Sequence, residues 1–225
     1  MAESFTLTLS GTSSVLTATY FPPIELSPHK QYMLALVELL TFNSIPNVDE
    51  GHNKLYIEGE KPIVFPTGSY EIDDIHHYAE QKAPGILIKP NNNTLRSELK
   101  YHKAIDFRPS DSIGLLLGFA PRLLTPNVLH ESDRPVAILK VNALRVECNI
   151  TGGAYIHAHR VHTIHEFFPT SPPGYKIVEV PSNPIYLPVT VTSIHHLQLR
   201  LIDQHGHLIN FRGEEITLRV HIKTV

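Results

Sequence analysis

The chain has 225 residues, a length that suits one all-β domain, or one domain with a small subdomain, and argues against two large domains. Its 18 prolines and 12 glycines, with 2 methionines and no tryptophan, favour short elements joined by many turns over long helices. The formal charge of −3 and the scattered Lys and Arg residues provide no basic surface for nucleic acid, and the single cysteine excludes an internal disulfide framework.

The N-terminal third predicts strands. Residues 5–9 alternate apolar and polar side chains, residues 15–20 are rich in β-forming types, and a Gly/Ser connector between them predicts a hairpin. The apolar run 31–42 suits a buried strand. Its Leu, Met, Ala and Glu residues are also compatible with a helix, but the flanking prolines favour the strand.

Residues 54–66 predict a second hairpin that turns near Gly59. A helix is predicted over residues 69–82, because Ile72, Ile75 and Ala79 recur at helical spacing and Ser69 is available as a cap. Residues 85–99 predict two strands across an asparagine-rich turn, and residues 105–109 a short strand.

A short helical turn is expected near residues 110–119. Ser110 or Asp111 is expected to cap it, and Ile113, Leu116 and Leu117 to pack it.

The second half consists of β-type runs separated by Gly, Pro, Asn or Asp. These runs cover residues 135–150, 154–167, 175–180, 184–191, 195–203 and 214–225. Residues 197–202 and 216–222 alternate strictly, which is typical of half-buried antiparallel strands. The fold predicted is therefore all-β: a single jelly-roll β-sandwich with one or two short helices in its connections, covering residues 1–225 as one domain.

The stretch 152–169 contains four histidines and a glutamate, which raises the question of a metal site. His157, His159 and Glu166 are the weak candidates for metal ligands, in a divergent cupin-like enzyme. Six residues separate His159 from Glu166, a spacing that does not fit the cupin pattern. On one continuous strand His157 and His159 also face the side opposite to His162, so we expect structural or interface histidines and no metal or other cofactor.

Other catalytic patterns are missing from the sequence. It contains no nucleophile elbow, phosphate-binding glycine loop or His-Glu-x-x-His motif, and Cys148 lies in a β-type run where a buried, inert thiol is expected. Asp73-Asp74 and His76-His77 are interpreted as a solvated helix face. Arg108, Arg122 and Arg134 fall in predicted loops, where contact with a partner is plausible. No enzyme is predicted.

The N-terminal residues lack the basic and apolar regions of a signal peptide. The most apolar run, residues 33–42, is about half as long as a bilayer requires, and Glu38 interrupts it. We therefore expect a protein that is not secreted, with no membrane partner and no direct nucleic-acid specificity.

The loop motifs carry a resemblance to a known family. In chain order they are YFPPIEL, LLTFNSIPN, GSYEI, NNNTL, SIGLLLGF, RVECNI, HTIHEFFP, PPGYKI, IYLPV and LINFRGEEIT. This string resembles the penton (minor capsid) proteins of Maverick/Polinton-type elements and the related adintoviruses. The resemblance covers nearly the whole chain, from about Phe5 to Lys223.

The resemblance implies a structural protein of the virion capsid, made in the host cell cytoplasm or nucleus. It would form homopentamers at the five-fold vertices of an icosahedral shell, with a double-jelly-roll major capsid protein as partner. A host-retained jelly-roll binding module is an alternative, as is a monomeric lectin-like or trimeric cytokine-like sandwich.

A five-fold ring requires a head-to-tail interface between two different sides of the subunit. Two predicted loops hold apolar clusters between turn residues and are the candidates for these contacts. The assembly residues predicted are Leu117, Phe119, Arg122, His165, Phe167, Phe168 and Tyr175.

Overall fold

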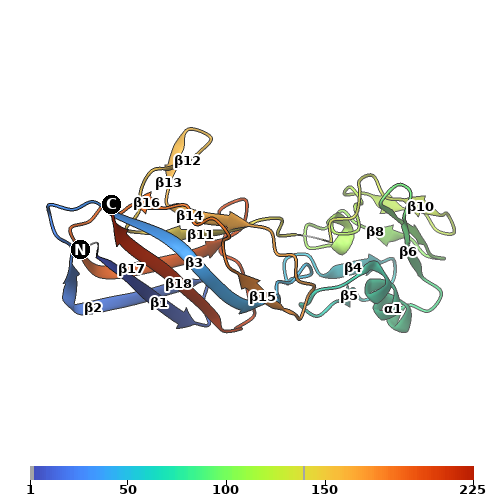
Figure 1. The fold of residues 1–225 in the computed structure, drawn as a ribbon. Coiled ribbons are helices and arrows are strands. Elements are labelled where there is room, and N and C mark those ends of the chain that lie inside the picture. The colour runs from blue at the N-terminus through green and yellow to red at the C-terminus, as the bar shows by residue number, and fades with distance from the viewer. Residues whose placement is uncertain (1–2, 139) are drawn as a thin grey trace. The chain divides into compact units, whose positions relative to one another are not determined.

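The computed structural model describes residues 3–138 and 140–225 (Figure 1). The chain divides into two compact units: unit 1 comprises Met1–Ile45 and Val141–Val225, and unit 2 comprises Pro46–Lys140. Each unit has its own cluster of buried apolar side chains. One domain over residues 1–225 stays a prediction; no feature of the sequence marked the boundaries of the two units within it.

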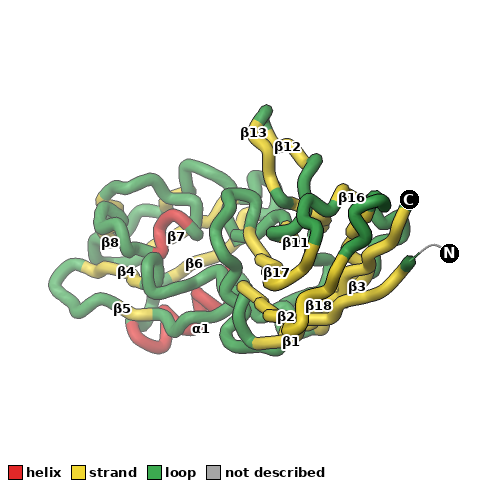
Figure 2. The backbone as a smooth tube through the Cα atoms, turned by 90° about the vertical axis from the view of Figure 1, so that its left-hand side faces the viewer, coloured by secondary structure: helices red, strands yellow, loops and turns green. Residues whose placement is uncertain are grey.

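Unit 1 is a sandwich of two antiparallel sheets. Its strands are β1 (Ser4–Gly11), β2 (Val15–Glu25), β3 (Tyr32–Phe42), β11 (Leu144–Cys148), β12 (Ala154–Ile156), β13 (His159–Val161), β14 (Thr163–Phe167), β15 (Lys176–Glu179), β16 (Leu187–Pro188), β17 (Ser193–Ile202) and β18 (Ile216–Thr224). One sheet has the order β1-β18-β3-β15, with β16 also on β3, and the other has the order β14-β11-β17-β2. β12 and β13 form a separate hairpin, which both views show extending away from the two sheets (Figures 1 and 2).

Alternation of apolar and polar residues explains how these strands build a common core. Ile216, Leu218, Val220 and Ile222 on β18 are fully buried, while the residues between them are exposed or half-buried. They pack with inward side chains of the second sheet, such as Leu199 on β17. The all-β jelly-roll prediction is confirmed, as is the strand assignment of β3.

The predicted N-terminal hairpin is wrong in its pairing, although both strands exist. β1 pairs with β18 and β2 pairs with β17, so the two strands belong to different sheets. The physical reason is that each strand buries its apolar face best beside a distant, strictly alternating strand, and a flexible Gly/Ser connector permits this crossing.

Unit 2 consists of shorter elements. They are β4 (Lys54–Ile57), β5 (Ile63–Val64), α1 (Ile72–Lys82), β6 (Leu87–Asn91), β7 (Arg96–Lys100), β8 (Ile105–Asp106), η1 (Ile113–Leu115), β9 (Leu123–Leu124) and β10 (His130–Glu131). The strands form the sheets β10-β7-β6 and β5-β4-β8-β9. The two predicted hairpins, β4–β5 and β6–β7, are confirmed.

The helix α1 buries Ile72, Ile75 and Ala79, as its periodicity predicts. Its predicted cap is wrong: Glu71 is the N-cap residue, and its backbone N–H donates to the Asp74 carboxylate at 2.9 Å. This capping box occupies the site that a serine cap would have used. The short turn η1 begins after Ser112, and not after Ser110 or Asp111.

Candidate assembly surface

The histidine-rich stretch is a hairpin and not the continuous strand that the sequence predicts. Ile156 on β12 lies opposite His159 on β13, so His157 and Ala158 form a two-residue turn. Both have positive φ, 47° and 66°, which is the backbone of the tight turns that usually require Asn or Gly. Because neither residue type predicts such a turn, sequence reasoning missed it.

The three candidate metal ligands lie on different elements, with His157 in the turn, His159 on β13 and Glu166 on β14. Glu166 lies on β14, where its carboxylate accepts a hydrogen bond from Nε of Arg145 at 2.6 Å. The His162 ring nitrogen Nδ1 donates to the backbone oxygen of Thr151 at 2.7 Å. Within residues 3–138 and 140–225, no group of three His, Cys, Asp or Glu side chains is placed to hold a metal ion.

Two of the predicted assembly residues in unit 2 are core residues. Leu117 and Phe119 are buried, and the Phe119 ring stacks on Phe107 with 5.0 Å between the ring centroids. Burial of Leu117 confirms the prediction that it packs the short helical turn, whereas the placement of Phe119 on an exposed loop is wrong. The unit is small, so it recruits loop residues to complete its core. These two side chains support the loop from within and face no partner themselves.

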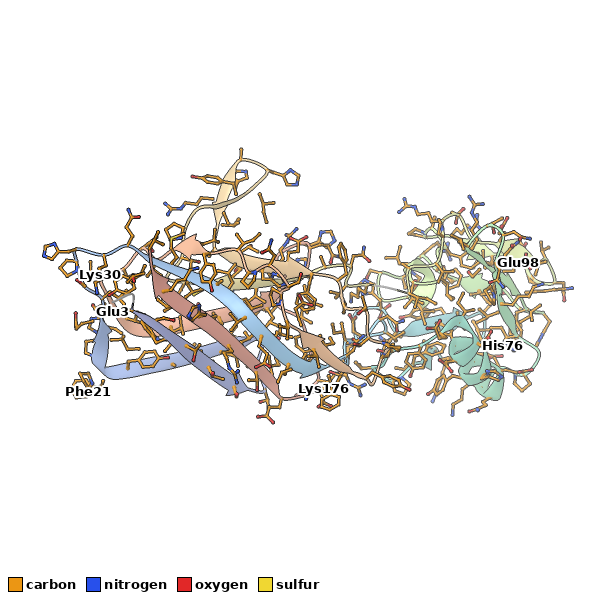
Figure 3. The ribbon with its side chains drawn as sticks, in the orientation of Figure 1. Glu3, Phe21, Lys30, His76, Glu98 and Lys176 are labelled. Atoms are coloured by element: carbon orange, nitrogen blue, oxygen red, sulfur yellow. The ribbon has the colours of Figure 1, made fainter. Side chains whose placement is uncertain are left out.

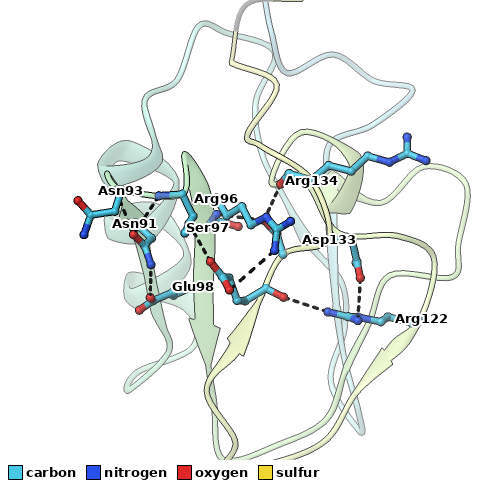
Figure 4. A network of polar contacts seen from close by, with 11 residues as sticks. Asn91, Asn93, Arg96, Ser97, Glu98, Arg122, Asp133 and Arg134 are labelled. Carbon is cyan, nitrogen blue, oxygen red and sulfur yellow. Dashed lines mark hydrogen bonds and ion pairs between the residues drawn. The ribbon is translucent and has the colours of Figure 1, made fainter.

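Arg122 is held inside the same loop system. Its guanidinium donates to Asp133 at 2.9 Å and to the backbone oxygen of Glu131 at 3.1 Å (Figure 4). The neighbouring Ser132 hydroxyl donates to the backbone oxygen of Arg134 at 2.8 Å. These contacts hold the loop 118–134 in one arrangement.

Other charged residues named from the sequence also have internal partners or lie in solvent. Arg108 donates two hydrogen bonds of 2.8 Å to the Asp106 carboxylate, and this lowers the pKa of Asp106. On α1, Asp73, Asp74 and His77 are exposed, in agreement with a solvated helix face, whereas His76 is half-buried and its Nε2 lies 3.5 Å from a carboxylate oxygen of Glu80.

The predicted assembly residues of unit 1 lie on and after β14. Nε2 of His165 is 2.8 Å from a carboxylate oxygen of Glu179 on β15, so this pair links an edge strand of one sheet to an edge strand of the other. Phe167 is buried in the core. Phe168 and Tyr175 are each 67% exposed. These two side chains are available to a partner, and their assembly role stays a prediction.

Sequence reasoning missed the most exposed aromatic side chain of unit 1. Phe21 on β2 is 98% exposed, although it lies within a strand of a sheet. The available signal was its position before Pro22-Pro23, because prolines cannot donate to a sheet ladder and mark edge strands or bulges.

Cys148 is buried on β11, and burial raises the pKa of its thiol to about 11. The prediction of a buried thiol is confirmed. Within the part of the chain that the structure describes, no helix is long and apolar enough to cross a membrane.

Comparison with known proteins identifies a solved structure with a similar fold. No protein-family model and no curated protein matches the chain. Among solved structures, the crystal structure of the mavirus penton protein matches with a TM-score of 0.55 and 10% sequence identity, over 100% of both chains. The chain has a penton-like fold.

This penton-like fold confirms the resemblance drawn from the loop motifs at the level of architecture. The match spans unit 1 and unit 2 alike, since it covers 100% of the chain. Kinship with Maverick/Polinton-type elements and adintoviruses stays a prediction, because a likeness at 10% identity concerns the fold alone.

Proposed function

We propose that this chain is a capsid penton protein that forms homopentamers at the five-fold vertices of an icosahedral, virus-like shell. The observation that carries the proposal is the fold match to the mavirus penton protein over the full length of both chains. The loop motifs provide separate support, because they resemble penton proteins in order along the sequence.

The proposed role is structural and not enzymatic. His157 occupies a hairpin turn, Glu166 pairs with Arg145, and Cys148 is a buried thiol with a raised pKa. These are the side chains that raised the question of catalysis, and each of them is accounted for by a role in the fold. This supports a protein that acts through contacts between its surface and other capsid subunits.

The partners follow from the same proposal. Each copy contacts two neighbouring copies, and the ring contacts a double-jelly-roll major capsid protein in the virion. This assembly requires neither a membrane nor a specific nucleic-acid sequence as a partner. The protein would be made in the host cell cytoplasm or nucleus and join the capsid there.

The mass of the purified protein in solution tests this proposal. Light scattering is expected to give five times the chain mass of 25.3 kDa, and electron microscopy is expected to show five-fold rings. Metal content is measured on the same sample. A monomer with stoichiometric metal would favour the cupin-like alternative, and a trimer would favour the cytokine-like one.

The exposed assembly residues provide a second test. We expect Phe168→Ser and Tyr175→Ser to weaken assembly without changing the free energy of unfolding by more than about 0.5 kcal/mol, because both side chains are mostly in solvent. Sedimentation measures assembly, and chemical denaturation measures stability. Unchanged assembly in both variants would remove this surface from the interface.

A further inference from the structure

Phe21 stands out because an almost completely exposed phenylalanine is presented by an ordered strand. The pairing of β2 with β17 jumps from Thr19↔His196 to Ile24↔Ile194, so residues 20–23 of β2 lie opposite a single residue of β17 and form an irregular bulge. Bulges at sheet edges redirect side chains. This bulge directs Phe21 into solvent at the rim of unit 1, as the labelled ring in Figure 3 shows.

The bulge is also stiff. Pro22 and Pro23 follow Phe21 directly, their rings restrict the backbone, and neither can donate a hydrogen bond. A stiff anchor loses little conformational entropy when it is buried by a partner. Phe21 is thus prepared for insertion, whereas an aromatic residue on a flexible loop would not be.

The same unit contains an open hollow whose walls are partly apolar and partly polar. It has a volume of about 330 Å³ and lies between the β2–β3 connection and the segment that joins β16 to β17. Leu26, Pro188 and Val191 contribute apolar surface to its walls, and Lys30 and Thr190 contribute polar groups. An enclosed apolar cavity of about 150 Å³ holds one benzene molecule, so by size alone this hollow accommodates a phenyl ring.

The hollow is not filled by the Phe21 of its own chain, because that side chain is 98% exposed. Phe21 precedes Leu26 by several residues of β2, and each extended residue advances the chain by about 3.3 Å. Figure 3 shows the separation through two labelled residues, with Phe21 at the lower rim and Lys30 at the upper rim of the same end of unit 1.

We propose that Phe21 of one copy inserts into this hollow of the next copy and anchors a head-to-tail contact between them. The inference rests on the proposed function, since it names the contact that joins neighbouring subunits of the ring. We assign a second copy as the occupant because each copy carries both an exposed Phe21 and an unfilled hollow. The two lie apart within one chain, but they can meet between two chains.

Charge does not oppose an apolar ring at the hollow. Lys30 is the charged residue of its lining, and its Nζ lies 2.6 Å from the Glu3 carboxylate, so this charge is paired within the chain. A contact between two different surfaces also repeats from copy to copy and closes a ring when the rotation permits.

Cysteine cross-linking tests the contact. The variant Phe21→Cys with Val191→Cys, treated with a short bismaleimide cross-linker, is expected to give a ladder of covalent species that ends at five copies. The native Cys148 is buried and does not compete. The matched control is Leu208→Cys with Val191→Cys: Leu208 is 51% exposed but bridges to Ile202, at the other end of β17. It is expected to give no ladder.

A second measurement does not depend on cross-linking. Phe21→Ser is expected to weaken each contact about 10- to 100-fold, the effect of leaving one phenyl ring unburied, while Phe21→Leu restores most of the association. Both variants are expected to keep the unfolding profile of the wild type, since Phe21 has no part in the core.

The outcomes separate this inference from the proposed function. A wild-type pentamer that gives no ladder and tolerates Phe21→Ser would overturn the insertion and leave the penton proposal standing. A ladder that runs past five copies would support the insertion and overturn the five-fold ring. A wild-type chain that stays monomeric at every concentration would overturn both.

Discussion

Unit 1 and unit 2 build their sheets from different kinds of strand pairs. In unit 2, the pairs β4–β5 and β6–β7 join neighbours in sequence, while β4 also pairs with β8 and β7 with β10. In unit 1, β1 pairs with β18 and β2 with β17, across most of the chain. Local turn patterns are therefore sufficient to predict the two hairpins of unit 2, whereas for β1 and β2 of unit 1 the choice of partner depends on which faces can be buried together.

The same contrast applies to the assembly residues. The apolar loop residues Leu117 and Phe119 complete the core of unit 2, where short elements leave room for them. In unit 1 the two sheets fill the core, and aromatic residues such as Phe21, Phe168 and Tyr175 stay exposed. An apolar loop is thus evidence for a partner only when the core beside it is already filled.

The largest expected effect tests whether the two units unfold separately. Phe119→Ala is expected to lower the free energy of unfolding of unit 2 by about 3–5 kcal/mol, because it removes a buried ring stacked on Phe107. Hydrogen exchange of unit 2 peptides measures this loss. Cys148 provides the probe for unit 1, since its buried thiol becomes reactive only when unit 1 opens.

Leu218→Ala is the matched change in unit 1, where Leu218 is fully buried on β18. It is expected to cost about 2–5 kcal/mol and to accelerate labelling of Cys148. Phe119→Ala is expected to leave that labelling rate unchanged. Equal acceleration by both variants would mean that the two units unfold together and not separately.

A glycine in unit 2 has the next largest expected effect. A Cβ on Gly118 would lie 2.2 Å from the backbone oxygen of Arg134, and Gly118 has a φ of +82°. Gly118→Ala is expected to destabilise unit 2 by about 2–4 kcal/mol through clash and backbone strain together. Gly59→Ala isolates the strain, since Gly59 has a φ of +73° and open space around it. Denaturant titration is expected to show a smaller loss, of about 1–2 kcal/mol.

Acid is expected to weaken an ion pair of unit 2. Lys54 and Tyr56 donate hydrogen bonds of 2.8 Å to Asp111, and the pKa of Asp111 is lowered below its ordinary 3.8. The stabilisation is therefore complete above about pH 4 and is lost as the pH falls through the lower folded-state pKa. Asp111→Asn is expected to flatten the loss of stability below pH 4, measured by denaturation at several pH values.

The control for this prediction is Glu58→Gln, a change at an exposed residue of the same unit. It is expected to leave the acid profile unchanged. If Asp111→Asn and Glu58→Gln have the same profile, the pair with Lys54 does not contribute to the acid sensitivity of unit 2.

The smallest expected effect concerns the hairpin of unit 1. Ala158 has a φ of 66°, a conformation that glycine adopts without a steric penalty. Ala158→Gly is expected to stabilise the β12–β13 hairpin by about 0.5 kcal/mol, because relief of strain is partly offset by the greater entropy of glycine in the unfolded chain. Slower hydrogen exchange of residues 154–161 would confirm it. Faster exchange would show that the turn is not strained.

The sequence was sufficient for most elements, for the all-β architecture and for the burial of Cys148, because alternation and turn composition act locally. It predicted β18 and β17 from strict alternation, and α1 from the spacing of Ile72, Ile75 and Ala79. Local patterns report which face of an element is apolar. They do not report which distant element covers that face.

Tertiary structure decided the rest. It placed β1 and β2 in opposite sheets, reversed the chain at His157 and Ala158, buried Phe119 and left Phe21 in solvent. Each outcome depends on how much apolar surface remains to be covered once the other elements have packed. That quantity belongs to the folded chain as a whole, and no single segment of the sequence contains it.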